Sequence, residues 1–213
     1  MSEKPILFST PMVRAILEGR KTQTRRVMSY QPDEEYTTVY GPEMYTQTLI
    51  DSNGEEQPGP EVFGVYGYDW SLKSPYGKPG DRLWVRETWL QDGGIYLYKA
   101  DFGMGVLSDS WSGHWKPSIH MPRAACRITL EIVRIRAERL QDISEEDSRA
   151  EGLATWRRNG ETQTYYGIDR SDIWETDSRL TFKRLWDSIN ASRGYGWNVN
   201  PWVWVIEFKK VHP

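Results

Sequence analysis

The sequence predicts an α+β fold in which a small mixed or antiparallel β-barrel carries flanking helices and long loop insertions. Strand-like segments outnumber helical ones, and they do not alternate with helices in the strand–helix–strand order that builds a parallel sheet. With 213 residues, the chain has the length of one domain. We therefore predict a single domain over 1–213, with insertions at about 29–79, 100–122 and 154–178.

The N-terminal segment predicts a strand, a helix and a second strand. The apolar residues at 6–8 are typical of a short buried strand. Thr10 and Pro11 are typical of a helix start, and Gly19 suits the left-handed position that ends a helix. Polar residues then alternate with β-forming residues over 21–27, which predicts the second strand.

The rest of the chain predicts further strands at 82–86, 95–99, 127–140 and 202–211. Within the third of these, the apolar positions change phase after Ile132, which predicts a β-bulge or a sharp bend.

Two helices are also predicted, and the insertions lack such patterns. One helix begins at Ser144 with acidic residues in its first turn, and the other has an apolar stripe over 182–189. Segment 29–79 reads as irregular, because Gly, Pro, Tyr and acidic residues recur there without a sustained period. Segment 103–122 reads as a loop, and the insertion at 154–178 is rich in aromatic residues and Arg.

The charge and composition of the chain limit where the protein is expected to act and which partners it can bind. The formal net charge of −3 argues against a protein that coats long nucleic acid by neutralising phosphates, but it leaves room for a local basic cleft. Cys126 is the single cysteine and can form no internal disulfide. Because neither an apolar run of about 20 residues nor a secretory leader is found, we expect a cytoplasmic location and no membrane partner.

Aromatic content is high, with eleven Trp and twelve Tyr. Two interpretations stay open for these side chains. They can stabilise a small core and its loops by packing, or they can form a surface on which bases stack.

The segment at 16–26 reads ILEGRKTQTRR and resembles the signature of the ASCH family, which is related to the PUA-like RNA-binding barrels. Three later segments match in the same order: PGDRLWV at 79–85, the corner and helix at 140–152, and WVIEF at 204–208. With HMPR at 120–123, the chain looks most like the longer, phage- or prophage-type members. The resemblance implies a PUA-like barrel and a nucleoside or short single-stranded RNA as the ligand.

Some small bacterial ASCH proteins are amidohydrolases that remove the acetyl group from N4-acetylcytidine. Their catalytic Lys, Thr and Glu fall on Lys21, Thr24 and Glu151 of this chain. A Lys held neutral by burial can activate a Thr hydroxyl, and a Glu can pass a proton to the leaving amine or orient the Lys and a water. In a regular strand Lys21 and Thr24 point to opposite faces, so we expect Lys21 on the turn after Gly19.

Basic residues near the matched motifs supply the predicted substrate-binding set, which is Arg20, Arg25, Arg26, Arg86, His120 and Arg123. Because neighbours on a strand face opposite ways, we expect only one of Arg25 and Arg26 to share the cleft. The three His and one Cys show no metal-ligand spacing, so we predict neither a metal nor a cofactor.

Two alternatives to a metal-independent amidohydrolase stay open. One is a non-catalytic RNA-binding module, and the other is a ribonuclease that uses the same basic cleft. The sequence leaves the oligomeric state open.

Overall fold

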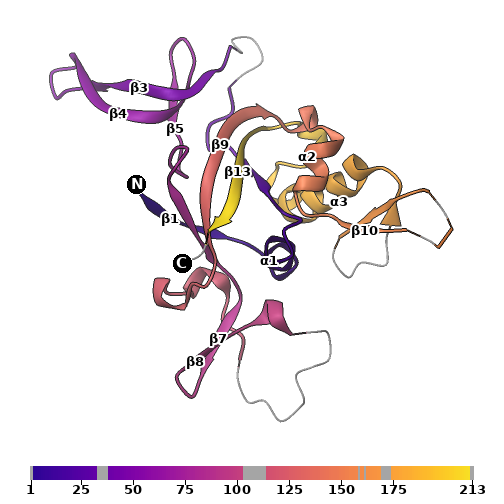
Figure 1. Ribbon diagram of the computed structural model, residues 1–213. Helices are drawn as coiled ribbons and strands as arrows, with labels where there is room; N and C mark the ends of the chain where they lie inside the picture. The colour runs from indigo at the N-terminus through magenta and orange to yellow at the C-terminus, as the bar shows by residue number, and fades with distance from the viewer. Residues whose placement is uncertain are drawn as a thin grey trace.

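The centre of the molecule is a five-stranded sheet in the order β1–β6–β9–β13–β2 (Figure 1). The computed structural model describes residues 2–32, 38–102, 114–157, 159–160, 162–168 and 174–211. The five strands are β1 (Glu3–Leu7), β2 (Gln23–Val27), β6 (Arg82–Arg86), β9 (Thr129–Arg139) and β13 (Trp202–Val211). Only β1 and β6 pair in parallel, so the sheet is mixed and the α+β class is confirmed.

Strand β13 separates two apolar cores, which explains its almost continuous apolar sequence. Trp204 and Ile206 enter a core that includes α1 (Thr10–Leu17). Val203 and Val205 enter a second core, under α3 (Ser178–Asn190). The short helix α2 (Glu145–Ala150) contacts α3 on this second side.

The two edge strands of the central sheet approach each other without pairing. Nη2 of Arg26, on β2, donates a hydrogen bond to the carbonyl oxygen of Leu7, on β1, at 2.5 Å. Within the described ranges no backbone ladder joins these two strands. The sheet is therefore strongly curled, and the closed barrel predicted from the sequence is not found.

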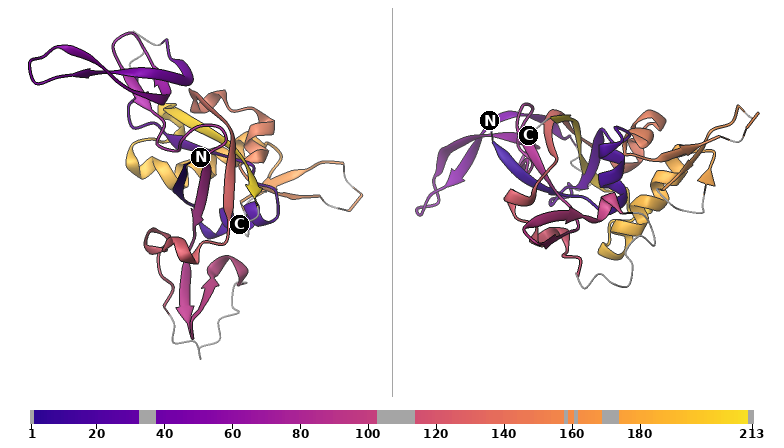
Figure 2. Two further views of the ribbon diagram at one scale, coloured as in Figure 1. Left: turned by 60° about the vertical axis from the view of Figure 1, so that its left-hand side comes forward. Right: turned by 60° about the horizontal axis from the view of Figure 1, so that its bottom comes forward.

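Three arms project from this body (Figures 1 and 2). The first contains β3 (Tyr40–Ile50), β4 (Glu56–Tyr66) and β5 (Ser71–Lys73). The second contains β7 (Trp89–Asp92) and β8 (Ile95–Tyr98), and the third contains β10 (Ala154–Trp156), β11 (Tyr165–Gly167) and β12 (Trp174–Glu175). Two arms fall in predicted insertions, at 29–79 and 154–178, and residues 103–113 of the predicted loop lie outside the described part of the chain.

The prediction that segment 29–79 is irregular is wrong, because β3 and β4 pair along most of their length. Most side chains of these strands are exposed, except near the base of the arm where Val62 and Val65 are buried. A hairpin that faces solvent on both sides needs no apolar alternation, so the pattern on which strand prediction rests is missing.

Several local predictions are confirmed. Ser144 caps α2, and its hydroxyl accepts a hydrogen bond from the Asp147 amide at 3.0 Å. Opposite β13, Arg134 pairs with Glu207 and Ile132 pairs with Phe208, which leaves Val133 as the residue of a β-bulge. This is the position at which the apolar phase changes in the sequence.

Candidate functional site

The turn after α1 holds Lys21 against the end of α2. Gly19 adopts the left-handed conformation, with a φ of 76°, and releases the chain from the helix. Lys21 lies before β2 and forms an isolated backbone bridge with Glu151. The Thr22 amide donates to the Ala150 carbonyl at 2.9 Å. Lys21 is therefore outside the regular strand, as convergence with Thr24 requires, and the strand predicted over 21–27 begins only at Gln23.

The Lys21 and Glu151 side chains form a buried pair. Nζ of Lys21 lies 2.8 Å from Oε2 of Glu151 and also donates to the Glu151 carbonyl oxygen at 2.8 Å. The side chains are 0% and 4% exposed. Burial lowers the pKa of the Lys21 ammonium, and the adjacent Glu151 carboxylate opposes this effect without cancelling it. The neutral amine is therefore easier to reach than in an ordinary lysine.

Arg25 holds the other oxygen of Glu151. Its Nη1 lies 3.1 Å from Oε1 of Glu151, while its Nη2 contacts Glu138 at 2.6 Å and Asp147 at 3.0 Å. Arg136 contacts the same Glu138 and Asp147 from the other side. Burial would raise the pKa of Asp147, but the two guanidinium groups outweigh it and the pKa lies below its usual range. Glu151 is thus fixed from two directions by an ion network.

Beside this network lies a cavity of about 260 Å³. Its walls come from α1, β2, α3 and the loop before β6, and the lining residues are Met12, Thr24, Arg25, Arg26, Val27, Tyr76, Glu151, Phe182, Leu185, Trp186, Ile189, Asn190 and Arg193. Thr24 and Glu151 share this cavity, whereas Lys21 is not among its lining residues. Lys21 contacts the cavity wall through its bond to Glu151.

The expectation that only one of Arg25 and Arg26 shares the cleft is wrong, because both line the cavity. The two side chains do diverge: the Arg25 guanidinium lies over the Phe182 ring, and that of Arg26 lies over the Phe8 ring. However, β2 is an edge strand, and four consecutive residues of it, at 24–27, line the cavity. Residues of both faces therefore reach it.

The open edge of β2 also presents backbone groups. The Thr22 carbonyl accepts from the Phe208 amide, and the Met28 amide donates to the Trp202 carbonyl. In an antiparallel ladder, alternate residues bond to the same neighbour, so the amide and carbonyl of Arg25 point away from β13. They therefore lie on the unpaired edge of β2, and Arg25 is one of the residues that line the cavity.

Arg26 carries a buried donor without a protein acceptor. Its Nη2 is bonded to Leu7, but its Nε is buried and has no partner in the described part of the chain. Buried polar groups are almost always satisfied in folded proteins. Because Arg26 also lines the cavity, its unpaired Nε–H is a candidate donor to a ligand.

The other predicted binding residues lie elsewhere. Arg20 is bonded to Glu18 and to the Gly152 carbonyl beside the Lys21–Glu151 bridge. The Arg86 and Arg123 guanidinium groups both contact Trp84, at 5.3 and 5.9 Å from the centroid of its ring. His120 is exposed in a short 3₁₀ turn. None of these four residues lines the cavity.

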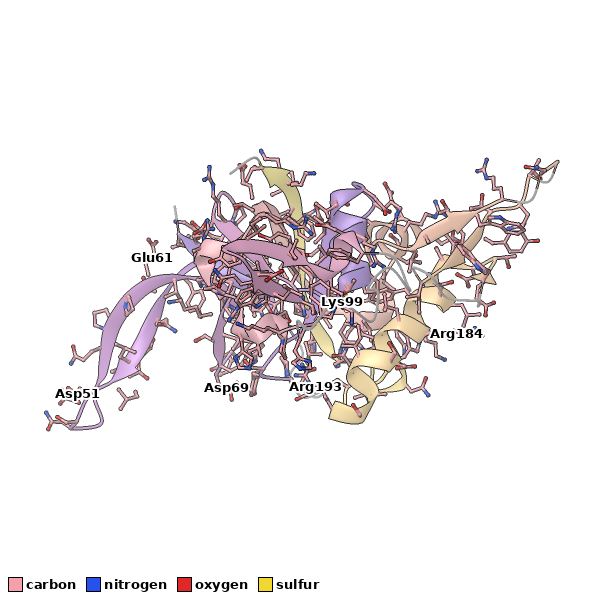
Figure 3. The ribbon with its side chains drawn as sticks, turned by 90° about the horizontal axis from the view of Figure 1, so that it is seen from below. Asp51, Glu61, Asp69, Lys99, Arg184 and Arg193 are labelled. Atoms are coloured by element: carbon pink, nitrogen blue, oxygen red, sulfur yellow. The ribbon has the colours of Figure 1, made fainter. Side chains whose placement is uncertain are left out.

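Sequence reasoning did not find the α3 wall of the cavity. Phe182, Trp186 and Asn190 recur at a spacing of four, so they share one helix face. From the sequence, the apolar residues over 182–189 predict only an amphipathic helix, and the signal for a cavity wall is the continuation of this face into Asn190 and Arg193. Arg193 lies in the 3₁₀ turn that follows α3 and is labelled beside that helix in Figure 3.

Compared with protein-family models, curated proteins and solved structures, the chain shows no match. In the described part of the chain, no helix combines the length and the apolar character needed to cross a membrane. The basis for assigning a function is therefore the geometry of the Lys21–Glu151 site together with the motifs of the sequence.

Proposed function

We propose that the chain is a metal-independent amidohydrolase of the ASCH family, with a PUA-like fold, that removes an acyl group from N4 of a cytosine nucleoside or of a modified base in RNA. The observation that carries this proposal is the buried Lys21–Glu151 pair at the wall of a cavity that Thr24 also lines. The resemblance of segment 16–26 to the family signature supports the same residues.

Amide cleavage at this site proceeds in two steps. Neutral Lys21 takes the hydroxyl proton of Thr24, and the Thr24 oxygen attacks the acyl carbon. The C–N4 bond breaks, N4 receives the proton from the Lys21 ammonium, and cytidine leaves. A water then loses a proton to Lys21 and attacks the Thr24 ester; the ester C–O bond breaks, the carboxylic acid leaves, and the Lys21 ammonium returns its proton to the Thr24 oxygen. Burial lowers the pKa of Lys21 and so favours the neutral amine that both steps require.

Glu151 fits the orienting role better than the proton-carrying one. Its two carboxylate oxygens each face a cation, Lys21 on one side and Arg25 on the other. This arrangement fixes the Lys21 amine and leaves little freedom for the carboxylate to rotate toward a leaving group. Arg25 acts as a positioning residue, because its donors are occupied by Glu151, Glu138 and Asp147.

The cavity supplies groups that suit a single base. Its volume of about 260 Å³ lies just below the range of about 300–1,000 Å³ that is usual for sites of drug-sized ligands. Phe182 and Trp186 supply aromatic rings to its lining, which suits contact with a base. The outward amide and carbonyl of Arg25 can pair with the polar edge of a base, and the unpaired Nε of Arg26 can donate to a carbonyl or phosphate oxygen.

The decisive experiment measures cytidine released from N4-acetylcytidine by the wild-type chain, by Lys21→Ala and by Lys210→Ala. Lys210 is exposed and far along β13, so its substitution is the matched control. Turnover by the wild type and by Lys210→Ala, with loss in Lys21→Ala, supports the proposal. Equal turnover by Lys21→Ala would refute the mechanism.

An RNA-binding module and a ribonuclease remain as alternative results of the same experiment. Salt-dependent binding of single-stranded RNA without any product from N4-acetylcytidine would favour the binding module. Shortened RNA would favour the nuclease.

A further inference from the structure

The arm formed by β3, β4 and β5 carries an unusual charge. Between residues 38 and 72 the chain has no Lys, Arg or His, and its acidic residues are Glu43, Asp51, Glu55, Glu56, Glu61 and Asp69. These six carboxylates carry more negative charge than the whole chain, whose net charge is −3, so the rest of the chain is net positive. Figure 3 shows Asp51 at the far tip of the arm, Glu61 part-way along it and Asp69 closer to the body.

One side of this arm encloses a cavity of about 440 Å³. Aromatic and acidic side chains dominate its lining, which consists of Tyr45, Thr46, Thr48, Glu56, Tyr66, Gly67, Tyr68, Asp69, Trp70 and Ser71. The Tyr45 and Tyr66 rings are 5.5 Å apart, and the Tyr66 hydroxyl donates to Glu43 at 2.6 Å. The Tyr45 and Tyr66 rings are therefore held in place by contacts within the arm.

The Tyr45 hydroxyl is the second observation that points to a ligand. Its oxygen is buried, and within the described residues it has no hydrogen-bond partner. A buried hydroxyl without a hydrogen-bond partner destabilises the fold, and a ligand that forms this hydrogen bond removes the cost. Because Tyr45 lines the cavity, a donor placed there would satisfy its oxygen.

We infer that this cavity binds a cationic side chain, Arg or Lys, from a basic segment of a partner protein. A guanidinium or ammonium group gains from aromatic faces, from the Glu56 and Asp69 carboxylates, and from the acceptor oxygen of Tyr45. Exposed Leu49 and Ile50 near the tip add apolar contact area around such a segment.

Aromatic cavities also bind RNA bases and sugars. The negative charge of the arm favours a basic peptide over both of these ligands. RNA phosphates are repelled by an arm on which six carboxylates outnumber its one cation over 40–73, Lys73 at the end of β5, so the arm does not extend the proposed RNA-base site. A neutral sugar can stack on aromatic rings, but it gains nothing from the long-range negative potential. A basic peptide gains both from contact with the aromatic rings and from the negative potential, which also attracts it toward the arm before binding.

The test is a calorimetric titration of the full chain with an octa-arginine peptide, with an uncharged octa-serine peptide as the control ligand. The site variant is Glu56→Gln with Asp69→Asn. Both side chains are exposed and have no hydrogen bond or ion pair among the described residues, so the fold is retained. The matched control is Asp142→Asn with Glu146→Gln, which removes the same charge from an exposed region outside the arm.

We expect octa-arginine to bind the wild type and the control variant within a factor of about two, and to bind the site variant at least about ten-fold more weakly. Tyr68, which is fully exposed, gives a second variant, and Tyr68→Ala is expected to weaken binding about three-fold. Equal losses in the site and control variants would show non-specific charge attraction and overturn the proposal. Absence of peptide binding would also overturn it, and salt-independent binding of cellohexaose would reassign the cavity to a sugar.

Discussion

Glu151 and Glu87 are both buried and both form an ion pair with an arginine, but their surroundings differ. They are 4% and 1% exposed, and each is bonded to a guanidinium group. Glu87 forms two bonds with Arg127, at 2.9 and 3.0 Å, and Arg127 also contacts Asp101. Glu151 divides its oxygens between Arg25 and Lys21 and lines the cavity that contains Thr24.

The difference between the two glutamates lies in the partner that can lose a proton. Arginine stays protonated in proteins, so the Glu87–Arg127 pair has no accessible neutral cation. Lysine can be deprotonated when burial lowers its pKa, as burial does for Lys21. A buried ion pair is therefore not a catalytic sign by itself. It becomes a candidate when a titratable amine contacts the wall of a cavity that a hydroxyl side chain also lines.

The largest expected effect concerns the nucleophile. Thr24→Ala should reduce N4-acetylcytidine hydrolysis by at least about 10³-fold, because no other hydroxyl group lies at this position of β2. Thr22→Ala is the matched control, since Thr22 is exposed and belongs to the same motif. Steady-state release of cytidine measures both variants. A Thr24→Ala enzyme with wild-type turnover would remove Thr24 from the mechanism.

The next effect compares the two carboxylates directly. Glu151→Gln should lower kcat about 10²-fold, because the Lys21 amine loses the charge that orients it. Glu87→Gln should stay within about two-fold of the wild type, because Glu87 does not line the cavity. The same cytidine assay, with circular dichroism to check folding, separates the two variants. An equal loss of kcat in both variants would show that removing any buried carboxylate lowers activity, whether or not it lies beside the cavity.

A smaller effect concerns the basic residues of the matched motif. Arg26→Lys removes the buried Nε donor and should raise KM about ten-fold, which corresponds to one lost charged hydrogen bond. Arg20→Lys should leave KM unchanged, because the Arg20 guanidinium is bonded to Glu18 and the Gly152 carbonyl outside the cavity. A KM change in Arg20→Lys alone would place the substrate elsewhere.

The smallest effect concerns stability at Glu87. Burial raises the pKa of Glu87 above its ordinary value of 4.5, and Arg127 opposes this only in part. A carboxyl with a raised folded pKa contributes stability that is complete below the unfolded pKa and is lost as pH rises through the folded pKa. The free energy of unfolding of the wild type, relative to Glu87→Gln, should therefore fall as pH rises from about 4.5. Urea unfolding at several pH values measures this difference, and a rise would contradict it.

Elements with a buried face were predictable from the sequence. The end of α1 at Gly19, the Ser144 cap, the bulge at Val133 and strand β13 all follow from local patterns that the structure confirms. The β3–β4 hairpin was not predictable, because both of its faces meet solvent and no apolar period marks it. Local pattern therefore fixes an element only when one of its faces is buried.

The candidate site was predictable only in part, for a related reason. The structure brings Lys21 and Glu151 together, as the family resemblance implies, although their roles stay a prediction. The bonds of Arg25 to Glu138 and Asp147 join residues more than one hundred positions apart. No local spacing encodes such pairs, and the α3 wall of the cavity has the same apolar spacing as an ordinary core helix.

The pH dependence of kcat/KM for N4-acetylcytidine tests the central claim most directly, namely that neutral Lys21 is the base. The rate should rise with pH along a limb whose pKa lies below 10.5, the ordinary value for lysine. Because the Glu151 carboxylate raises the pKa of Lys21, Glu151→Gln should move this limb to lower pH, while Glu87→Gln should leave it in place. A limb that stays in place in Glu151→Gln, or a rate independent of pH, would contradict the assignment of Lys21 as the base.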